Sequence, residues 1–411
     1  MPDVNFQDGP LTGVRVIELG HALAGPFACS LLADMGAEVI KVEPVGSGDG
    51  HRLDGFKEAG IGLWWTVTAR NKKSVALDVK SEEGLAIVRE LVAASDVLVE
   101  NFRPGVLERM GLAWSELSLL NDRLILLRVS GFGQTGPYSY RRGFGKVAEA
   151  FSGATNLTGE ADRPPVHPGY SLADAVTGLM GAFGVTAALH GRAAGAGGQQ
   201  VDLALYEGLL RMVEWQLPYM SRLGFNSKRN GVEFPFSHGA YLTGIWPSQD
   251  GHHIAVSSAT AETLRRVMRV LKENNAWTLP DDGAPEVPDV AAAMRTWMAA
   301  TDAAEILKEL EEAGAVAGLI FDPAMIADDP HMRARESVVE HHHPDIGTIT
   351  MPGVVPKLSV TPGRIHHAAP GLGEQTEEVL RDVLGYTDDK IGSLTASGIA
   401  QSAARISPEH R

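Results

Sequence analysis

Short apolar runs alternate with stretches of helical periodicity along the first third of the chain. Runs rich in Val, Ile and Leu predict buried strands over residues 14–18, 38–42, 74–77, 97–99 and 124–129. Between them, apolar residues recur three and four positions apart, which predicts helices over residues 26–35 and after Ser81, a residue suited to cap a helix. Strands that alternate with helices predict an α/β fold with a doubly wound parallel sheet, covered on both faces.

A long apolar helix is predicted over residues 170–192, followed by a strand over 201–205 and a helix over 206–220. Three glycines lie inside the first of these helices: Gly178, Gly181 and Gly184. An interior glycine costs about 1 kcal/mol relative to alanine. Three of them therefore indicate that this helix packs closely against another element.

The pattern changes near residue 224, where a loop-rich stretch begins. A strand and two helices are then predicted over residues 254–256, 261–271 and 302–313. From residue 336 onward strands and turns rich in Pro and Gly resume, and a last helix is predicted over 376–383. We therefore predict a large domain over residues 1–223, a smaller α+β domain over 224–335, and a return to the large domain over 336–411.

Composition and charge narrow the class of protein. The chain of 411 residues is 44% hydrophobic and 21% charged, as in ordinary globular proteins, and its formal net charge is −15. So acidic a surface disfavours nucleic acid and anionic membranes as partners. The single cysteine, Cys29, excludes an internal disulfide framework. We find neither a secretory signal pattern nor a run of about 18 apolar residues, so we expect a cytoplasmic protein without a membrane span.

Residue spacing disfavours two kinds of site. Residues 20–25, after the first predicted strand, lack the G-x-G-x-x-G pattern of dinucleotide sites, and the glycines of residues 46–50 follow the second strand instead. His341, His342 and His343 are consecutive, so in an extended segment they point to alternate faces, and three such imidazoles rarely bind one metal ion together. We expect neither a nicotinamide cofactor nor a metal.

Asp174 is the first candidate for chemistry. It lies at the start of the apolar helix predicted over residues 170–192, where free N–H groups and the helix dipole stabilise a carboxylate. One interpretation is an aspartate that caps the helix, which is the common role at such a position. The other is a nucleophilic carboxylate beside N–H donors that could receive an oxyanion. Spacing alone leaves both open.

Basic residues cluster after the predicted strands despite the acidic total. The clusters are Arg70, Lys72, Lys73 and Lys80; Arg103 and Arg109; and Arg141, Arg142 and Lys146. Such residues are often solvated surface charges, but the segments that follow parallel strands also form the ligand crevice of such a sheet. The clusters therefore favour a ligand that carries phosphate groups.

Several segments in order resemble the class III CoA-transferases, a family that includes the formyl-CoA and carnitine CoA-transferases. The matching segments are residues 11–18, 24–26, 32–43, 46–49, 71–74, 100–105, 173–174 and 372–376. Each segment alone is a weak signal, but their joint order and spacing is specific.

The resemblance implies a mechanism and a fold. Asp174 stands where the family has its nucleophilic aspartate, which attacks an acyl-CoA thioester and passes through anhydride and aspartyl-CoA intermediates. Because every intermediate is activated, water must be excluded. The implied fold is a Rossmann-like large domain with a smaller domain, and two chains interlock as a homodimer. Acyl-CoA and a carboxylic acid are the implied substrates, with no tightly bound cofactor.

The resemblance also implies residues that contact CoA. The matching positions are His21, Ala22, Leu23, Ala24, Leu77, Lys80, Asn101, Phe102 and Arg109. Lys80 and Arg109 would bind phosphates. Arg141 and Arg142 lie near the position of a lysine in the formyl-CoA transferases and could replace it.

Departures from the family pattern bear on the substrate. Pro44 replaces an arginine of the formyl-CoA transferases, and residues 231–241, with His238, do not match their glycine-rich flap. Arg141, Arg142 and His238 could bind the second carboxylate of a C4–C5 dicarboxylic acid such as succinate.

Two other functions are open from the sequence. α-Methylacyl-CoA racemases share the fold and the aspartate, but they pair it with a histidine that residues 143–146 lack, and a racemase needs two proton-transfer groups. A non-catalytic CoA-binding subunit is the second alternative.

Overall fold

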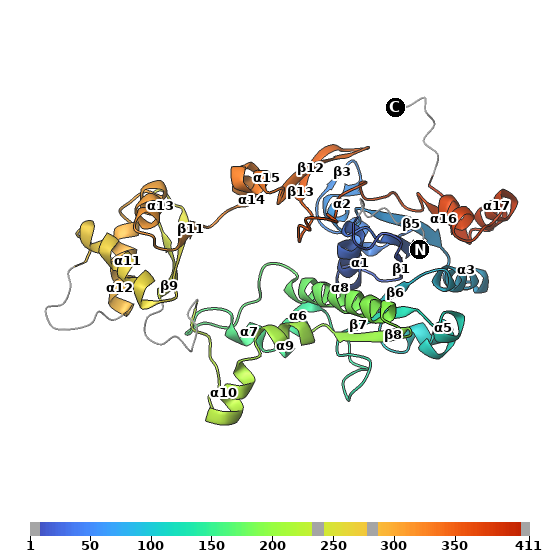
Figure 1. The fold of residues 1–411 in the computed structure, drawn as a ribbon, viewed down its shortest axis with the longest axis horizontal. Helices are drawn as coiled ribbons and strands as arrows, with labels where there is room; N and C mark the ends of the chain where they lie inside the picture. The colour runs from blue at the N-terminus through green and yellow to red at the C-terminus, as the bar shows by residue number, and fades with distance from the viewer. Residues whose placement is uncertain (1–8, 232–241, 278–286, 404–411) are drawn as a thin grey trace. The chain divides into compact units, whose positions relative to one another are not determined.

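A seven-stranded sheet is the centre of the first of two units into which the chain divides (Figure 1). The computed structural model describes residues 9–231, 242–277 and 287–403. The first unit comprises Met1–Ala154, Pro168–Glu214 and Pro330–Arg411, and the second comprises Thr155–His167 and Trp215–Asp329. The domain boundaries expected after residues 223 and 335 stay predictions.

The order of the strands creates a switch point in the sheet. The strands are β1 (Arg15–Glu18), β2 (Glu38–Glu43), β5 (Lys72–Leu77), β6 (Val97–Glu100), β7 (Ile125–Ser130), β8 (Gln199–Ala204) and β14 (Ala400–Gln401), in the spatial order β14-β5-β2-β1-β6-β7-β8. Every pair is parallel except β14 with β5. An α/β fold with a mostly parallel sheet is thus confirmed. The chain runs outward from β1 in both directions, so β1 and β6 flank the place where ligands bind in such sheets.

Apolar side chains of the strands alternate between two packed layers. On one face of the sheet, Val16 and Val39 pack against α1 (Ala24–Asp34) and α8 (Leu172–Ala193). On the other face, Ile17 and Ile40 belong to the apolar core that α3, α5, α16 and α17 cover. These helices span Glu82–Ala93, Trp114–Leu120, Thr376–Asp382 and Asp388–Ala396. Ser81 caps α3 through its side chain, as its position predicted.

Helix α8 packs closely against its neighbours through its glycines. A Cβ on Gly178 would lie 2.7 Å from the Phe27 ring of α1, and one on Gly181 would lie 3.0 Å from Leu127 of β7. A Cβ on Gly184 would lie 2.9 Å from Val201. The close packing predicted from the three glycines is confirmed.

Within the described residues, α8 is the one helix long and apolar enough to cross a membrane, with a mean hydropathy of 1.5 over 18 residues. The core helix of a soluble protein meets the same criterion. Because α8 packs on α1, β7 and β8, its apolar residues have protein partners on that side.

The second unit has an antiparallel sheet of its own. Strands β9 (Leu242–Pro247), β10 (His253–Ser258) and β11 (Ala317–Leu319) lie in the order β11-β10-β9. The helices of this unit include α10 (Gln216–Leu223), α11 (Ala261–Glu273), α12 (Val287–Met298), α13 (Ala303–Glu312) and α14 (Pro323–Asp328). The prediction of a single helix over residues 206–220 was wrong, because α9 (Glu207–Met212) ends before α10 begins. Pro218 lacks an N–H and would break a continuous helix, but the first turn of α10 accepts it.

The remaining elements are short. They are the 3-10 helix η2 (Gly50–Leu53), α2 (Leu63–Thr68), α4 (Val106–Arg109), α6 (Gly145–Phe151), α7 (Ala154–Leu157), α15 (Pro330–Ala334) and the hairpins β3 (Lys57–Glu58) with β4 (Ile61–Gly62) and β12 (Val338–His343) with β13 (Gly347–Pro352). His341–His343 lie on β12, and no group of three His, Cys, Asp or Glu suited to a metal occurs among the described residues.

Candidate active site

A crevice lies at the switch point, at the carboxyl ends of β1, β6 and β7. It encloses about 180 Å³. Its lining includes eight of the residues expected from the sequence, namely His21, Ala22, Leu23, Ala24, Asn101, Phe102, Arg141 and Asp174. Residues more than 150 positions apart in the sequence therefore meet at one site.

Other expected site residues lie outside this crevice. Lys80, Arg109 and Arg142 are exposed and do not line it. Leu77 is fully buried in the core, so its side chain offers no surface to a ligand. His238 lies outside the described residues.

The Asn101 side chain joins the loops that follow β1 and β6. Its Oδ1 accepts a hydrogen bond from the His21 N–H (2.8 Å), and its Nδ2 donates to the His21 carbonyl (2.7 Å). The ring of His21 also meets the ring of Phe102 edge-on, at 5.1 Å between centres. These contacts fix the two walls of the crevice relative to each other.

A buried network of ion pairs holds the loop that follows β1. Lys41 Nζ lies 2.6 Å from Glu18 and 2.8 Å from Asp49, and it donates to the Gly20 carbonyl at 2.9 Å. Lys72 Nζ lies 2.8 Å from the other oxygen of Glu18. All four side chains are buried. Charged residues inside apolar strand runs are the sequence signal for such a network. Of the four, only Lys72 is interpreted from the sequence, as a surface or ligand-binding charge, and the network itself is not identified.

The network reaches the strained part of the loop. Ala22 has φ 57°, a left-handed conformation that costs a residue with a Cβ about 1–2 kcal/mol. Its N–H donates to Asp49 Oδ1 at 3.3 Å. Burial opposes the ionised form of Asp49, but Lys41 and backbone N–H groups outweigh burial and lower the pKa of this carboxyl. Asp49 therefore stays charged and keeps Ala22 in place beside the crevice.

Asp174 lies in the first turn of α8 and faces the crevice half-buried. Burial raises the pKa of its carboxyl, and the negative charge of Glu149 adds to this, while Lys146 opposes it. The residue before the helix, Ser171, makes no side-chain cap. A carboxylate with a raised pKa in a crevice is typical of a functional group.

Glycines allow the backbone to approach the Asp174 carboxylate. A Cβ on Gly145 would lie 2.4 Å from Asp174 Oδ2. Nearby, a Cβ on Gly131 would lie 2.8 Å from the Cα of Gly143. The wall of the crevice therefore has no room for side chains at these positions. The sequence does not identify Gly145 as a site residue, because the contact is between residues distant in sequence.

We expect Gly145→Ala to lower kcat by about 100-fold, because the added methyl group displaces the Asp174 carboxylate and a shift near 1 Å has that cost. Steady-state kinetics of both enzymes with an acyl-CoA donor, the substrate that the family resemblance implies, measure this difference. Gly191→Ala is the matched control on α8, since a Cβ there meets nothing within 4 Å. A Gly145→Ala enzyme with wild-type kcat contradicts the proposed contact.

Arg141 is held at the crevice by an aromatic cluster. Its guanidinium carbon lies 3.6 Å from the centre of the Tyr138 ring. Tyr138 packs edge-on against Phe132 and Phe151, with 6.1 Å between ring centres in each case. Within the described residues Arg141 makes no ion pair, so its charge is available to a ligand.

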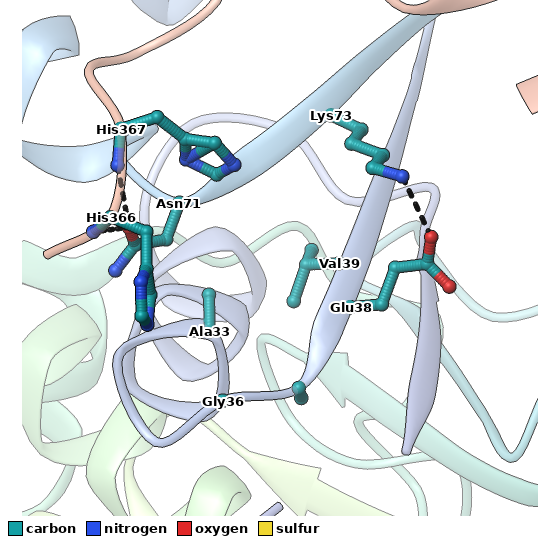
Figure 2. A pocket seen from close by; sticks show the side chains of 9 residues that line it. Ala33, Gly36, Glu38, Val39, Asn71, Lys73, His366 and His367 are labelled. Carbon is teal, nitrogen blue, oxygen red and sulfur yellow. Dashed lines mark hydrogen bonds and ion pairs between the residues drawn. The ribbon is translucent and has the colours of Figure 1, made fainter. Parts of the chain in front are cut away.

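A second cavity of about 300 Å³ lies at the amino ends of β2 and β5 (Figure 2). Asn71 accepts there from the His366 N–H at 2.7 Å and donates to Asp34 at 2.9 Å. Lys73 is paired with Glu38 at 2.9 Å. These polar groups are already bound to protein partners, so we assign no ligand to this cavity.

Comparison with known proteins identifies the family. A family model described as CoA-transferase family III matches residues 11–376. The chain belongs to this family. The class III transferase resemblance drawn from the ordered motifs is therefore confirmed, and the protein is an enzyme whose family acts on acyl-CoA.

Individual relatives of this class III CoA-transferase agree with the family. The enzyme is 41% identical to the succinyl-CoA–D-citramalate CoA-transferase of Chloroflexus aurantiacus, over 95% of this chain and 98% of the relative. It is 40% identical to the beta subunit of succinyl-CoA–L-malate CoA-transferase of the same organism, with the same coverage. The crystal structure of a CAIB/BAIF family protein from Brucella suis matches 92% of this chain and all of that chain, with a TM-score of 0.81 and 29% identity. These transferases favour CoA transfer over the racemase and the non-catalytic subunit.

Proposed function

We propose that this class III CoA-transferase moves CoA between a succinyl-CoA-type thioester and a C4–C5 dicarboxylic acid, with Asp174 as the nucleophile. The observation that carries the substrate class is Arg141, which shares the crevice with Asp174 and makes no ion pair among the described residues. An arginine with fixed planar geometry suits a carboxylate. The named transferase relatives act on succinyl-CoA and on malate or citramalate, which supports the same class.

In the proposed reaction every covalent intermediate on Asp174 is an activated anhydride or thioester, so the energy of the donor thioester is retained. The Asp174 carboxylate attacks the donor thioester carbonyl, and CoA leaves as the thiolate with the bonding electron pair. The thiolate then attacks the Asp174 carbonyl of the mixed anhydride, which releases the donor as a carboxylate. The acceptor carboxylate attacks the aspartyl-CoA thioester, and the freed thiolate attacks the acceptor carbonyl of the second anhydride. Asp174 is regenerated as a carboxylate.

Several CoA contacts belong to this proposal. His21, Ala22, Leu23, Ala24, Asn101 and Phe102 line the crevice and are the proposed contacts near the thioester. Lys80, Arg109 and Arg142 are exposed cations and are the proposed phosphate contacts. Charges beyond about 8–10 Å are screened, so these cations can outweigh the acidic remainder of the surface.

The interlocked homodimer is also part of the proposal. Apolar side chains of α8 such as Leu179 and Phe183 are exposed in the single chain, at 52% and 69%. Exposed apolar residues on a long helix support a protein partner on that face. Light scattering of the purified protein tests this expectation.

A panel of donors and acceptors tests the substrate class. Acetyl-CoA, succinyl-CoA and mesaconyl-CoA are each incubated with monocarboxylates and with C4–C5 dicarboxylates, and the CoA products are read by mass spectrometry. We expect transfer to dicarboxylates to exceed transfer to monocarboxylates. Transfer only to monocarboxylates contradicts the proposal.

We expect Arg141→Ala to raise the KM for the dicarboxylate by about 10- to 100-fold, because a charge-assisted hydrogen bond contributes about 1.5–3 kcal/mol. Its effect on a monocarboxylate acceptor is expected to be small. Arg123→Ala is the control. Arg123 is exposed and precedes β7, so it lies at the amino end of this strand, whereas the crevice lies at the carboxyl end. Equal losses for both acceptor types argue against Arg141 as the carboxylate receptor.

A further inference from the structure

An ion pair on α6 lies next to the Asp174 nucleophile and has no part in the mechanism above. Lys146 Nζ lies 3.0 Å and 3.1 Å from the two carboxylate oxygens of Glu149. Glu149 has no exposed surface. A buried carboxylate is costly unless it is paired, and the half-exposed Lys146 supplies the partner for Glu149.

The Lys146 ammonium also binds the segment that leads into α8. It donates to the carbonyl of Pro168 at 2.8 Å and to the carbonyl of Tyr170 at 2.7 Å. Asp174 follows in the first turn of α8. Because α6 packs against α8, one ammonium fixes the approach of the chain to the nucleophile.

The pair also sets the charge around Asp174. Burial raises the pKa of the Asp174 carboxyl, the Glu149 charge raises it further, and Lys146 lowers it. Arg141, from the loop before α6, and His21, from the loop after β1, share the crevice. Of these groups, Glu149 is the buried negative charge that acts on Asp174. A more basic carboxylate is a stronger nucleophile toward a thioester.

We propose that Lys146 and Glu149 are positioning residues of the transferase: the ammonium fixes the entry to α8, and the buried Glu149 charge makes the Asp174 carboxylate more reactive. This inference rests on the proposed role of Asp174. It gives Glu149 a function that an uncharged side chain of the same shape does not have. A purely structural role needs only hydrogen-bond acceptors for Lys146, which glutamine supplies in part.

The pH dependence of kcat/KM separates the two roles, because its acid limb reports the ionisation of the essential carboxylate in the free enzyme. Glu149→Gln removes the neighbouring negative charge and leaves Lys146 in place, so the pKa of Asp174 falls. We expect the acid limb to move to lower pH and kcat at neutral pH to fall about tenfold or more, with the donor KM changed less. Lys146→Met removes the positive charge, and we expect its acid limb to move to higher pH.

The opposite directions of the two shifts are the decisive result. Loss of activity in both variants with a wild-type acid limb overturns the electrostatic role. If circular dichroism shows that Glu149→Gln is poorly folded, the acid limb of the Lys146→Met profile alone tests the electrostatic role. Lys146→Arg keeps the positive charge, so we expect its acid limb to match that of the wild type. An Asp174→Ala enzyme that still transfers CoA overturns the proposed function itself. Dependence on Asp174 with unshifted limbs overturns only the role of the pair.

Discussion

Asp174→Ala is expected to abolish CoA transfer, with a fall in kcat of about 10³-fold or more, while CoA still binds. The reason is that the proposed covalent route needs a carboxylate at this position to form the anhydride. A water molecule in its place cannot form that intermediate. Asp174→Asn keeps the shape of the side chain and is expected to be equally inactive. Steady-state transfer assays and CoA binding by calorimetry measure the two parts of this result.

Mass spectrometry of the intact protein gives a direct reading of the same step. Wild-type enzyme incubated with a thioester donor is expected to carry a covalent CoA adduct, and peptide mapping is expected to locate it at Asp174. The Asp174→Ala enzyme is expected to carry none. An adduct on another residue, or full transfer by Asp174→Ala, contradicts the nucleophile assignment.

The alternative role of Asp174 as a helix cap makes a different prediction. Loss of a capping residue costs about 1 kcal/mol of stability and leaves the chemistry intact. Asp289, in the first turn of α12, is a matched control because it is exposed and also stands at a helix start. We expect Asp289→Ala to leave kcat unchanged. Similar small effects of both variants favour the capping interpretation.

Much of the fold could be predicted because burial on two faces imposes a strong pattern. The segments at residues 97–99 and 125–127 are continuous apolar runs, as is typical of parallel strands covered on both sides. The glycines of α8 indicated close packing for a similar reason. Periodicity did not predict β14 (Ala400–Gln401), because a two-residue edge strand has too few positions for a pattern.

The crevice was predictable only in part. His21 and Asn101 were identified through the family resemblance, and both lie after strands whose carboxyl ends form the crevice. The sequence does not reveal that Gly145 touches Asp174, or that Asn101 bonds the backbone of His21, since both depend on how loops distant in sequence meet. The order of residues along the chain does not specify these contacts between loops.

Lysines inside strands show the same limit. Lys41 and Lys73 lie on neighbouring strands and are indistinguishable by residue type. Lys41 is buried, at 2% exposure, whereas Lys73 is 27% exposed and bridges Glu38 and Glu378. Only the three-dimensional position separates a structural ion from a surface ion. The energetic consequences of the two positions differ greatly.

Lys41→Met is therefore expected to destabilise the fold by about 3–5 kcal/mol, the cost of removing one partner from a buried ion pair. Glu18 and Asp49 lose the ammonium that lies within 2.8 Å of each, and the Gly20 carbonyl loses its donor. Lys73→Met is the matched control, and we expect it to cost less than about 1 kcal/mol because its ion pairs are partly exposed to solvent. Urea denaturation followed by circular dichroism measures both values.

The pH dependence of this stability difference follows from Asp49. Burial works against its ionised form, yet Lys41 and its other partners lower the pKa of its carboxyl below the unfolded value. A group with a lowered pKa stabilises the fold above its unfolded pKa, and this contribution is lost as the pH falls through the folded pKa. The difference between wild type and Lys41→Met should thus be largest at neutral pH and shrink in acid, as Asp49 protonates. Equal stabilities of Lys41→Met and Lys73→Met at neutral pH contradict the assignment of Lys41 to a buried network that holds the β1 loop.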